Sequence, residues 1–300
     1  MNDYAARLPI GHNPNSVILS AVEGSVPHPS PNAFDGHTRV MKGSTMQPQT
    51  HTNGHGQSLH GKVALVTGAG SGLGEAAATA FAGAGCAVAC CDLDQQAAER
   101  VAHAIGAGDI GSLALQCDVA DEESVARAVE AAVARFGRLD IVVNNAAIDY
   151  TVSIEEMTVE QWDRVLAVNL RGPFLFAKAA LPVMRRQHAG HFFNVASTAA
   201  TRAWANASAY HASKWGLVGF TRGLGVEGRP DGIKATTVIP GGMRTHFFDR
   251  FVEQGIPMPE PENLQDPANV AAVMVFAAQL PCESSLQEVI VTPMTETSWP

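Results

Sequence analysis

Short apolar runs alternate along most of the chain with longer segments whose apolar residues recur at helical spacing. The runs that predict strands are residues 63–68, 87–92, 112–118, 139–146, 191–197, 234–241 and 287–293. The segments that predict helices are residues 75–82, 95–105, 122–136, 159–186 and 208–227. Apolar strands that alternate with helices form a parallel sheet covered on both faces. The pattern therefore predicts an α/β fold with a doubly wound parallel sheet, the Rossmann fold, with seven strands in a single domain.

Residues 1–60 lack this periodicity. They are rich in Pro, His, Asn, Ser and Gly and carry few large apolar side chains, so they predict a disordered tail ahead of one domain over residues 61–300. His51, His55 and His60 lie close together in this stretch of the sequence. The intervening glycines disfavour the helix that would align these side chains, and no metal site is expected.

Composition and charge narrow the classes of partner. Of the 300 residues, 46% are hydrophobic and 16% are charged, which suits one large domain with a buried core. The net charge of −9 argues against nucleic acid or an anionic membrane as the partner. No signal peptide is visible and no apolar stretch reaches the ~18 residues of a membrane span, so we expect a cytoplasmic protein. The cysteines form no CxxC pair and are expected to be reduced and mostly buried: Cys86, Cys90, Cys91, Cys117 and Cys282.

A glycine-rich loop, TGAGSGLG at residues 67–74, joins the first predicted strand to the first predicted helix. Glycine permits a tight turn and lets backbone N–H groups approach a pyrophosphate, which then lies at the positive end of the helix. Asp92 follows at the end of the second strand, where an acidic residue can accept hydrogen bonds from a ribose. The combination predicts a site for a dinucleotide cofactor.

The carboxylate of Asp92 favours NAD over NADP. It would repel a 2′-phosphate, and two unit charges ~4 Å apart cost about 4 kcal/mol at an effective dielectric near 20. Neither Ser71 nor Leu93 offers a compensating cation. Asp92 could also cap the helix that follows it, which is compatible with binding a ribose. Asp118, at the end of the third strand, could likewise be a cap or could bind the adenine.

Tyr210 and Lys214 are four residues apart in a predicted helix and therefore share one face. A free tyrosine has a pKa of ~10, and a neighbouring ammonium and a positive nicotinamide ring both favour its ionised form. A Tyr–Lys pair at this spacing is often only a surface pair. Ser197 at the end of the fifth strand and Asn169 in the preceding long helix favour a catalytic interpretation instead.

Taken together, these motifs resemble the short-chain dehydrogenase/reductase family in its compact single-domain branch. The matching segments are TGAGSGLG (67–74), NNAA (144–147), VNLRGPF around Asn169, Ser197, YHASK (210–214) and PGGMRT (240–245). The resemblance covers residues 61–300. It implies an NAD(P)-dependent oxidoreductase that interconverts a secondary alcohol and a ketone. Ala147 departs from the family pattern, since glycine is common at this position.

By this similarity, Tyr210 removes the hydroxyl proton of the substrate while a hydride passes to the nicotinamide, and Ser197 binds the reacting oxygen. Lys214 holds the nicotinamide ribose, Asn169 supports a water that continues the proton path, and Thr245 holds the carboxamide end of the cofactor. The cofactor-binding residues implied by the resemblance are Gly68, Gly70, Ser71, Gly72, Leu73, Gly74, Asp92, Asp118, Val119, Asn145, Ala146, Tyr210, Lys214, Pro240, Gly241 and Thr245.

The substrate is not specified by these motifs. The candidate lining residues are Asp149, Tyr150, Thr198, Trp204, Phe247 and Phe248, a mixture that admits steroids, polyols, cyclic alcohols or polyketide intermediates. Residues 243–264 are too apolar for a plain solvated loop, so we expect either a lid over the substrate or a segment packed statically on the core.

Two alternatives to a single-domain alcohol dehydrogenase remain. A catalytically silent, NAD-sensing protein could use the same fold, but it would not need Asn169, Ser197, Tyr210 and Lys214 together. An epimerase or dehydratase of the longer branch is disfavoured by the glycine spacing and by the absence of a sizeable extra C-terminal domain.

Small residues also predict an assembly. Ala212, Gly216, Gly219 and Gly223 form a stripe roughly opposite the Tyr210–Lys214 face of the helix, although each interior glycine costs ~1 kcal/mol of helix stability relative to alanine. The stripe predicts close packing against another subunit in a homo-oligomer, a dimer or tetramer. Packing on a helix of the same chain is the alternative.

Overall fold

The computed structural model describes residues 56–106, 111–249, 251 and 258–296. Within them seven parallel strands form one sheet in the order β3-β2-β1-β4-β5-β6-β7. The strands are β1 (Val63–Thr67), β2 (Ala87–Asp92), β3 (Ser112–Gln116), β4 (Ile141–Asn144), β5 (Gly190–Val195), β6 (Ile233–Pro240) and β7 (Glu288–Val291). The predicted doubly wound parallel sheet is confirmed.

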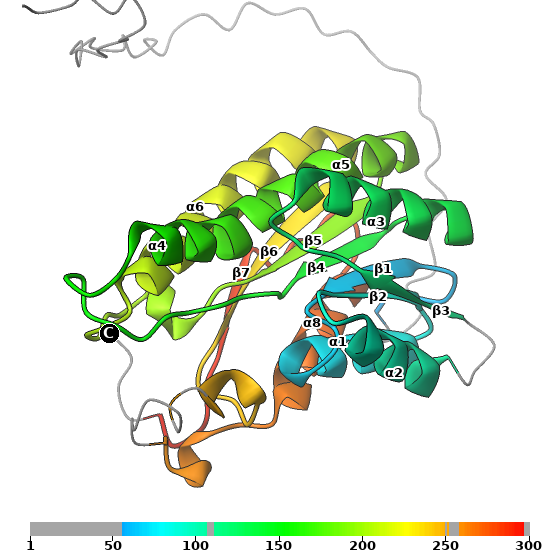
Figure 1. Ribbon diagram of the computed structural model, residues 1–300. Coiled ribbons are helices and arrows are strands. Elements are labelled where there is room, and N and C mark those ends of the chain that lie inside the picture. The colour runs from blue at the N-terminus through cyan, green and yellow to red at the C-terminus, as the bar shows by residue number, and fades with distance from the viewer. Residues whose placement is uncertain (1–55, 107–110, 250, 252–257, 297–300) are drawn as a thin grey trace, which may run out of the picture. The chain divides into compact units, whose positions relative to one another are not determined.

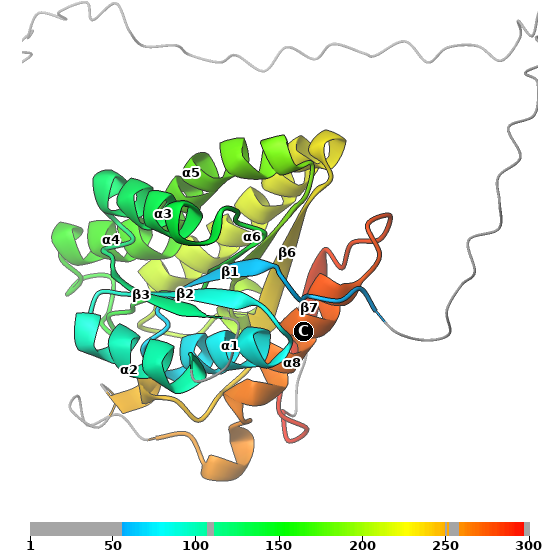
Figure 2. The ribbon, with the colours of Figure 1, turned by 90° about the vertical axis from the view of Figure 1, so that its right-hand side faces the viewer.

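Helices cover both faces of the sheet, as Figures 1 and 2 show. One layer contains α1 (Gly72–Gly83), α2 (Gln95–Ile105) and α8 (Pro267–Gln279). The other layer contains α3 (Glu122–Phe136), α4 (Val159–Leu166), α5 (Gly172–Gln187) and α6 (Ser208–Gly228). The central strands are apolar on both faces because both faces are buried, and all five residues of β1 are inaccessible to solvent.

The hydrophobic pattern does not predict helix α8, which the structure contains. It begins at Pro267 after Asp266, whose carboxylate accepts a hydrogen bond from the backbone N–H of Ala268 at 2.8 Å. An N-cap aspartate followed by proline is an ordinary helix start signal. The residues that follow are nearly all apolar, so they show no helical period, and the signal at the start was the only one that could have revealed the helix.

The long helix predicted over residues 159–186 is divided in two. Helix α4 ends at Leu166, a π-helical turn spans Ala167–Arg171, and α5 continues from Gly172. In the π turn the N–H of Gly172 bonds the carbonyl of Ala167, five residues earlier. Such turns are frequent at functional sites because they shift the register of the side chains that follow.

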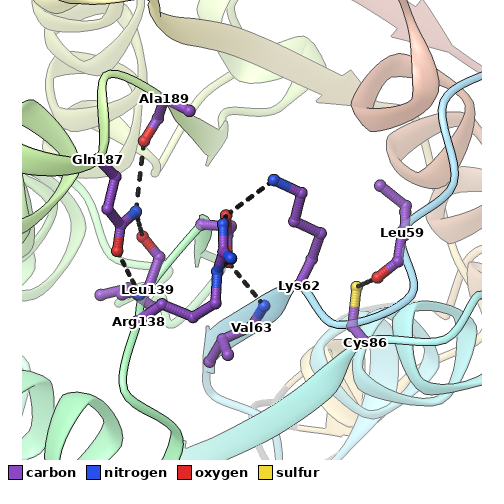
Figure 3. Close-up of polar contacts among 9 residues, drawn as sticks. Leu59, Lys62, Val63, Cys86, Arg138, Leu139, Gln187 and Ala189 are labelled. Atoms are coloured by element: carbon purple, nitrogen blue, oxygen red, sulfur yellow. Dashed lines mark hydrogen bonds and ion pairs between the residues drawn. The ribbon is translucent and has the colours of Figure 1, made fainter.

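The amino ends of β1 and β4 are joined by the carboxylate of Asp140. Arg138 donates to both of its oxygens, at 2.6 and 2.7 Å, and Lys62 donates to Oδ1 at 3.2 Å. The backbone N–H of Val63 donates to Oδ2 at 3.0 Å. Figure 3 shows these contacts beside the side chain of Gln187, which bonds the backbone N–H and carbonyl of Leu139. Charge-assisted hydrogen bonds therefore fix the amino ends of β1 and β4 relative to each other.

Residues 56–60, which the sequence pattern places in the tail, contact the domain. Leu59 is buried, its carbonyl accepts from the thiol of Cys86 (Figure 3), and the N–H of Gln57 bonds the carbonyl of Gln279 at 2.7 Å. The ring of His60 lies against Gly85. The domain thus begins several residues before the predicted boundary. Residues 1–55, with His51 and His55, lie outside the described part.

The cysteines of the described residues are all free thiols. Burial raises the pKa of Cys86 and of Cys90 to about 12, so these thiols are unreactive. Cys282 is exposed, in contrast to the others. No helix within the described residues is long and apolar enough to cross a bilayer.

Candidate functional site

A cavity of about 670 Å³ opens at the carboxyl ends of β1, β4, β5 and β6. The sheet order reverses between β1 and β4, and in doubly wound folds ligands bind at such a switch point. Most of the predicted cofactor residues line this cavity: Gly68, Ser71, Gly72, Leu73, Asp92, Asp118, Val119, Asn145, Ala146, Tyr210, Lys214, Pro240, Gly241 and Thr245. Gly70 and Gly74 do not line it and contribute to the shape of the loop instead.

The glycine loop brings helix α1 into contact with the turn that precedes it. A Cβ on Gly74 would lie 1.9 Å from the carbonyl oxygen of Gly68, so only glycine fits there. Gly68 has a positive φ of 61°, and its own Cβ would press on Ala146. Ser71 occupies the N-cap position without using its hydroxyl for the helix, and it lines the cavity. The cradle therefore fits a pyrophosphate at the positive end of α1.

Hydrogen bonds between β1 and β4 hold this loop in shape. The hydroxyl of Thr67 accepts from the backbone N–H groups of Asn145 and Ala146, at 3.0 and 3.1 Å. The side-chain amide of Asn145 donates to the carbonyl of Thr67 at 3.0 Å and to that of Gly68 at 3.3 Å. Asn145, which the resemblance assigns to the cofactor, thus uses its side chain to support the loop beneath the cofactor.

Asp92 reaches the cavity from the end of β2. Its Oδ2 accepts from the N–H of Gly70 at 2.8 Å and its Oδ1 from the N–H of Asp94 at 3.0 Å. The N-cap of α2 is Asp94, and the alternative that Asp92 caps this helix is wrong. A cation lies nearby that the sequence analysis missed. Arg100 donates to the carbonyl of Gly70 at 2.7 Å, but it is also paired with Glu75.

Asp118 and Arg164 form an ion pair where the cavity meets α4. Arg164 donates to the two oxygens of Asp118 at 3.2 and 3.4 Å, and both residues line the cavity. Asp118 also accepts from the backbone N–H of Ala120 at 2.9 Å, but the N-cap of the helix that follows is Asp121, so the alternative that Asp118 caps this helix is wrong. Sequence reasoning missed Arg164 because it lies 46 residues from Asp118 in the chain.

Tyr210, Lys214 and Ser197 meet in the same cavity. Tyr210 and Lys214 lie on α6, and the ammonium nitrogen of Lys214 is 5.5 Å from the centre of the Tyr210 ring. Lys214 donates to the carbonyl of Val195 at 2.7 Å, at the end of β5. Ser197 follows that strand and accepts from the N–H of Ala199 at 3.1 Å. A hydroxyl, a phenol and an amine therefore face one space, which suits proton transfer to or from an oxygen.

Burial changes the titration of Lys214. The side chain is inaccessible to water, and loss of hydration lowers its pKa to about 7. The negative charge of Asp149 acts in the opposite direction and is the smaller effect. Burial therefore disfavours the ammonium form of Lys214 that the Tyr–Lys spacing suggested.

Asn169 lies in the π turn, and its side chain does not line the cavity. Its amide donates to the carbonyl of Ile148 at 2.9 Å and to the hydroxyl of Ser213 at 3.1 Å, and its oxygen accepts from the N–H of Ile148 at 2.9 Å. These bonds fix the loop after β4 against α6. That Asn169 supports a water, as the resemblance implies, stays a prediction.

Four of the six residues expected to contact the substrate line the cavity: Thr198, Trp204, Phe247 and Phe248. Asp149 and Tyr150, also expected there, are not among the lining residues. The ring of Phe247 lies 5.7 Å from that of Tyr210. His211 accepts from the N–H of Trp204 through Nε2 and donates to the carbonyl of Ala199 through Nδ1, so it fixes the Trp204 loop beside α6.

Two charged residues to which no motif points, Arg202 and Glu296, also line the cavity and form an ion pair. Residues 243–264 are the segment predicted to form a lid. Residues near both of its ends line the cavity, among them Phe247 and Leu264. Residues 250 and 252–257 of that segment lie outside the described part. Whether it moves remains a prediction.

Comparisons with known proteins agree with this geometry. A family model described as short chain dehydrogenase matches residues 62–255. D-threitol dehydrogenase of Mycolicibacterium smegmatis is 44% identical over 183 residues, which are 61% of this chain and 70% of that protein.

Solved structures of the same kind superpose on most of the chain. The 3-ketoacyl-(acyl-carrier-protein) reductase from Brucella melitensis complexed with NADH has 37% identity and a TM-score of 0.70, over 78% of this chain and 98% of that one. A metagenomic short-chain oxidoreductase in complex with NADP has 29% identity and a TM-score of 0.69, over 80% of this chain and 100% of that one.

The buried lysine generates a prediction about stability and pH. The ordinary pKa of lysine is 10.5, whereas the folded, cofactor-free protein holds Lys214 at about 7. Between these values the unfolded chain binds more protons, so this group makes stability rise as pH increases from 7 to 10.5. Lys214→Met removes that gain. The Tm advantage of the variant over the wild type should therefore be largest near pH 7 and should shrink toward pH 10.

Thermal unfolding of both proteins without cofactor, at several pH values, measures this difference. Lys178→Met is the control, because the Lys178 ammonium is exposed beside Glu122 and is hydrated in both states. A Tm difference for Lys214→Met that does not change with pH would show that Lys214 titrates as an ordinary lysine.

Proposed function

This chain belongs to the short-chain dehydrogenase family and is an oxidoreductase of that family; we propose that it interconverts a secondary alcohol and a ketone with NAD as the cofactor. One observation carries the proposal. The phenol of Tyr210, the hydroxyl of Ser197 and the amine of Lys214 line one cavity with a glycine cradle that fits a pyrophosphate. A protein that only senses NAD would not need these three groups together.

The cofactor, when bound, supplies the hydride acceptor or donor. The other functions belong to this chain. Ser197 binds the reacting oxygen, and Tyr210 removes its proton in oxidation or returns the proton in reduction. The cavity shields Tyr210 from bulk water, since only 7% of its surface is exposed. Asn169 acts indirectly by holding the loop at Ile148, which lines the cavity.

Lys214 is well placed to assist Tyr210. Its hydrogen bond to Val195 keeps the amine near the phenol ring. A negative charge on Tyr210 would raise the pKa of Lys214 from about 7, so that the amine takes up a proton from solvent. The resulting ammonium stabilises the tyrosinate.

Replacing Tyr210 with phenylalanine removes the phenol and keeps the ring. We expect kcat for oxidation of a secondary alcohol to fall by about 10²- to 10⁴-fold, because general base catalysis is lost, while NADH still binds. Reduced cofactor is followed by absorbance and NADH binding by fluorescence titration.

Tyr150→Phe is the matched control, because Tyr150 does not line the cavity, and it should keep the wild-type rate. Near-normal kcat in Tyr210→Phe would rule out the assigned base. A wild-type protein that binds NADH but turns over no secondary alcohol or ketone in a broad screen would favour the sensor.

We further propose a preference for NAD. The supporting observation is that the Asp92 carboxylate lines the cavity beside Gly70, where it would repel a 2′-phosphate. Arg100 lies near, but its guanidinium is paired with Glu75 and lowers the pKa of that carboxyl. Its positive charge is therefore largely neutralised in place.

Asp92→Ala should lower the ratio of kcat/KM for NAD to kcat/KM for NADP by about tenfold or more, because the charge that repels the 2′-phosphate is removed. Kinetics with both cofactors and one alcohol measure this ratio. Asp94→Asn removes a charge two residues away and should leave the ratio unchanged. A wild-type preference for NADP would contradict the proposal.

A homo-oligomer is the third part of the proposal. A Cβ at Gly216 would lie 3.0 Å from Leu170 of the same chain, so this glycine serves internal packing, as the alternative predicts. A Cβ at Gly219 or Gly223 would meet nothing within 4 Å. Phe174 on α5 and Trp215 on α6 are about half exposed, at 48% and 55%. An open glycine surface beside exposed aromatic rings suits a second subunit.

Gly219→Leu tests this surface. A Cβ at this position meets nothing of the same chain within 4 Å, and leucine has a higher helix propensity than glycine, so the fold should be retained. In a dimer or tetramer packed on this face, leucine should lower the oligomeric state measured by light scattering. Gly83→Leu, on the exposed surface of α1, is the control. A monomeric wild type, or an unchanged assembly in Gly219→Leu, would overturn the proposed interface.

A further inference from the structure

An ion pair between residues far apart in the sequence lies at the substrate end of the cavity. Arg202 follows β5 and Glu296 lies near the end of the chain, and the guanidinium of Arg202 donates to the carboxylate of Glu296. Both residues line the cavity that holds Tyr210 and Ser197. Their side chains are mostly buried, with 31% and 16% of their surfaces exposed. No step of the proposed mechanism uses them.

Contacts from three directions hold Glu296 in this place. Its backbone N–H bonds the carbonyl of Pro293 at 3.0 Å, which closes a turn after β7. A Cβ on Gly241 would lie 3.1 Å from the Glu296 carboxylate, so the turn packs on the loop after β6. Thr295 donates to the carbonyl of Glu262 at 2.8 Å, which joins the turn to the segment beyond Phe248. The C-terminal segment is thus one wall of the substrate end.

The cavity that the pair lines also has large apolar residues in its wall: Trp204, Met243, Phe247, Phe248 and Leu264. A guanidinium donates hydrogen bonds, and a carboxylate accepts them. A hydroxyl group does both, so one hydroxyl can bond to both partners without separating them. An aliphatic group at the same place would leave two partly buried charges without added contacts.

We propose that Arg202 and Glu296 form a subsite for a second, non-reacting hydroxyl group, and that the substrates are uncharged diols or polyols. This inference rests on the proposed alcohol dehydrogenase function. A substrate with a carboxylate fits the subsite less well, because Glu296 already neutralises Arg202 and would repel a second negative charge. A simple aliphatic alcohol fits the aromatic surfaces but gains nothing from the pair.

Values of kcat/KM for three four-carbon secondary alcohols distinguish a diol, a simple alcohol and a substrate with a carboxylate. 2,3-Butanediol carries a second hydroxyl, 2-butanol carries none, and 3-hydroxybutanoate carries a carboxylate. We expect the wild type to favour the diol over 2-butanol in kcat/KM by about 10- to 100-fold, the effect of one hydrogen-bonded group on a charged pair. The diol should also exceed 3-hydroxybutanoate.

Two variants should then shift the preference in different ways. Arg202→Met removes the donor, so the diol should lose about tenfold or more while 2-butanol changes little. Glu296→Gln keeps the size of the side chain and leaves Arg202 with a net charge, so 3-hydroxybutanoate should gain relative to the diol. NADH binding, measured by fluorescence, should be unchanged in both, which shows that the fold and the cofactor site persist.

The surface pair Arg222–Glu288 supplies a control, because it is also an arginine–glutamate pair between distant parts of the chain but does not line the cavity. Arg222→Met should leave all three rates as in the wild type. A wild type that oxidises 2-butanol or 3-hydroxybutanoate as well as the diol overturns the subsite alone. So does a diol preference that survives both cavity variants. A wild type that oxidises no secondary alcohol with NAD or NADP overturns the proposed function itself.

Discussion

Helix α1 must begin in van der Waals contact with the turn before it, and the rest of the site depends on this approach. The carbonyl of Gly68 occupies the space where any other residue at position 74 would place its Cβ. A larger residue would move the helix away and carry its amino end out of reach of a pyrophosphate. Hydrogen bonds between Thr67 and Asn145 hold the ends of β1 and β4 against this turn. The cofactor cradle and the loop that leads to Ile148 therefore share one support.

A buried charged or titratable side chain lies at each end of the strands, and the surroundings of the two side chains differ. At the amino ends, the buried carboxylate of Asp140 is paired with Arg138 and Lys62 and accepts from a backbone N–H. At the carboxyl ends, burial lowers the pKa of Lys214, because loss of hydration disfavours its charged form. Perturbed titration of this kind is typical of functional sites, because a group near its pKa can change charge when its surroundings change. The contacts of Asp140 fix the amino ends of β1 and β4, whereas the carbonyl of Val195 at the end of β5 holds the buried Lys214.

The sequence indicated the strands, the cradle and the triad of Ser197, Tyr210 and Lys214 well, because local rules determine them. Apolar runs mark buried parallel strands, and a four-residue spacing places two side chains on one helix face. Local rules failed where long-range packing decides. The break at Ala167–Arg171 places Asn169 in contact with Ile148 and Ser213, and no periodicity reveals these long-range contacts. Asp149 and Tyr150 follow the NNAA motif closely, yet the chain turns before it presents them to the cavity.

The substrate end shows the same division between local and long-range information. Its aromatic residues lie in segments whose composition already suggested a binding surface, whereas Glu296 reaches it from a tail that has no motif of its own. The carboxylate lies there because a turn after β7 packs against Gly241 and because Thr295 bonds to Glu262. Three separate loops thus surround the proposed substrate end, while helix α6 and the end of β5 carry the groups proposed for the reaction. Loops can change without disturbing a scaffold, so one arrangement of Ser, Tyr and Lys can serve different alcohols in related proteins. In this chain the charged pair that joins two of those loops is where such a difference would be expressed.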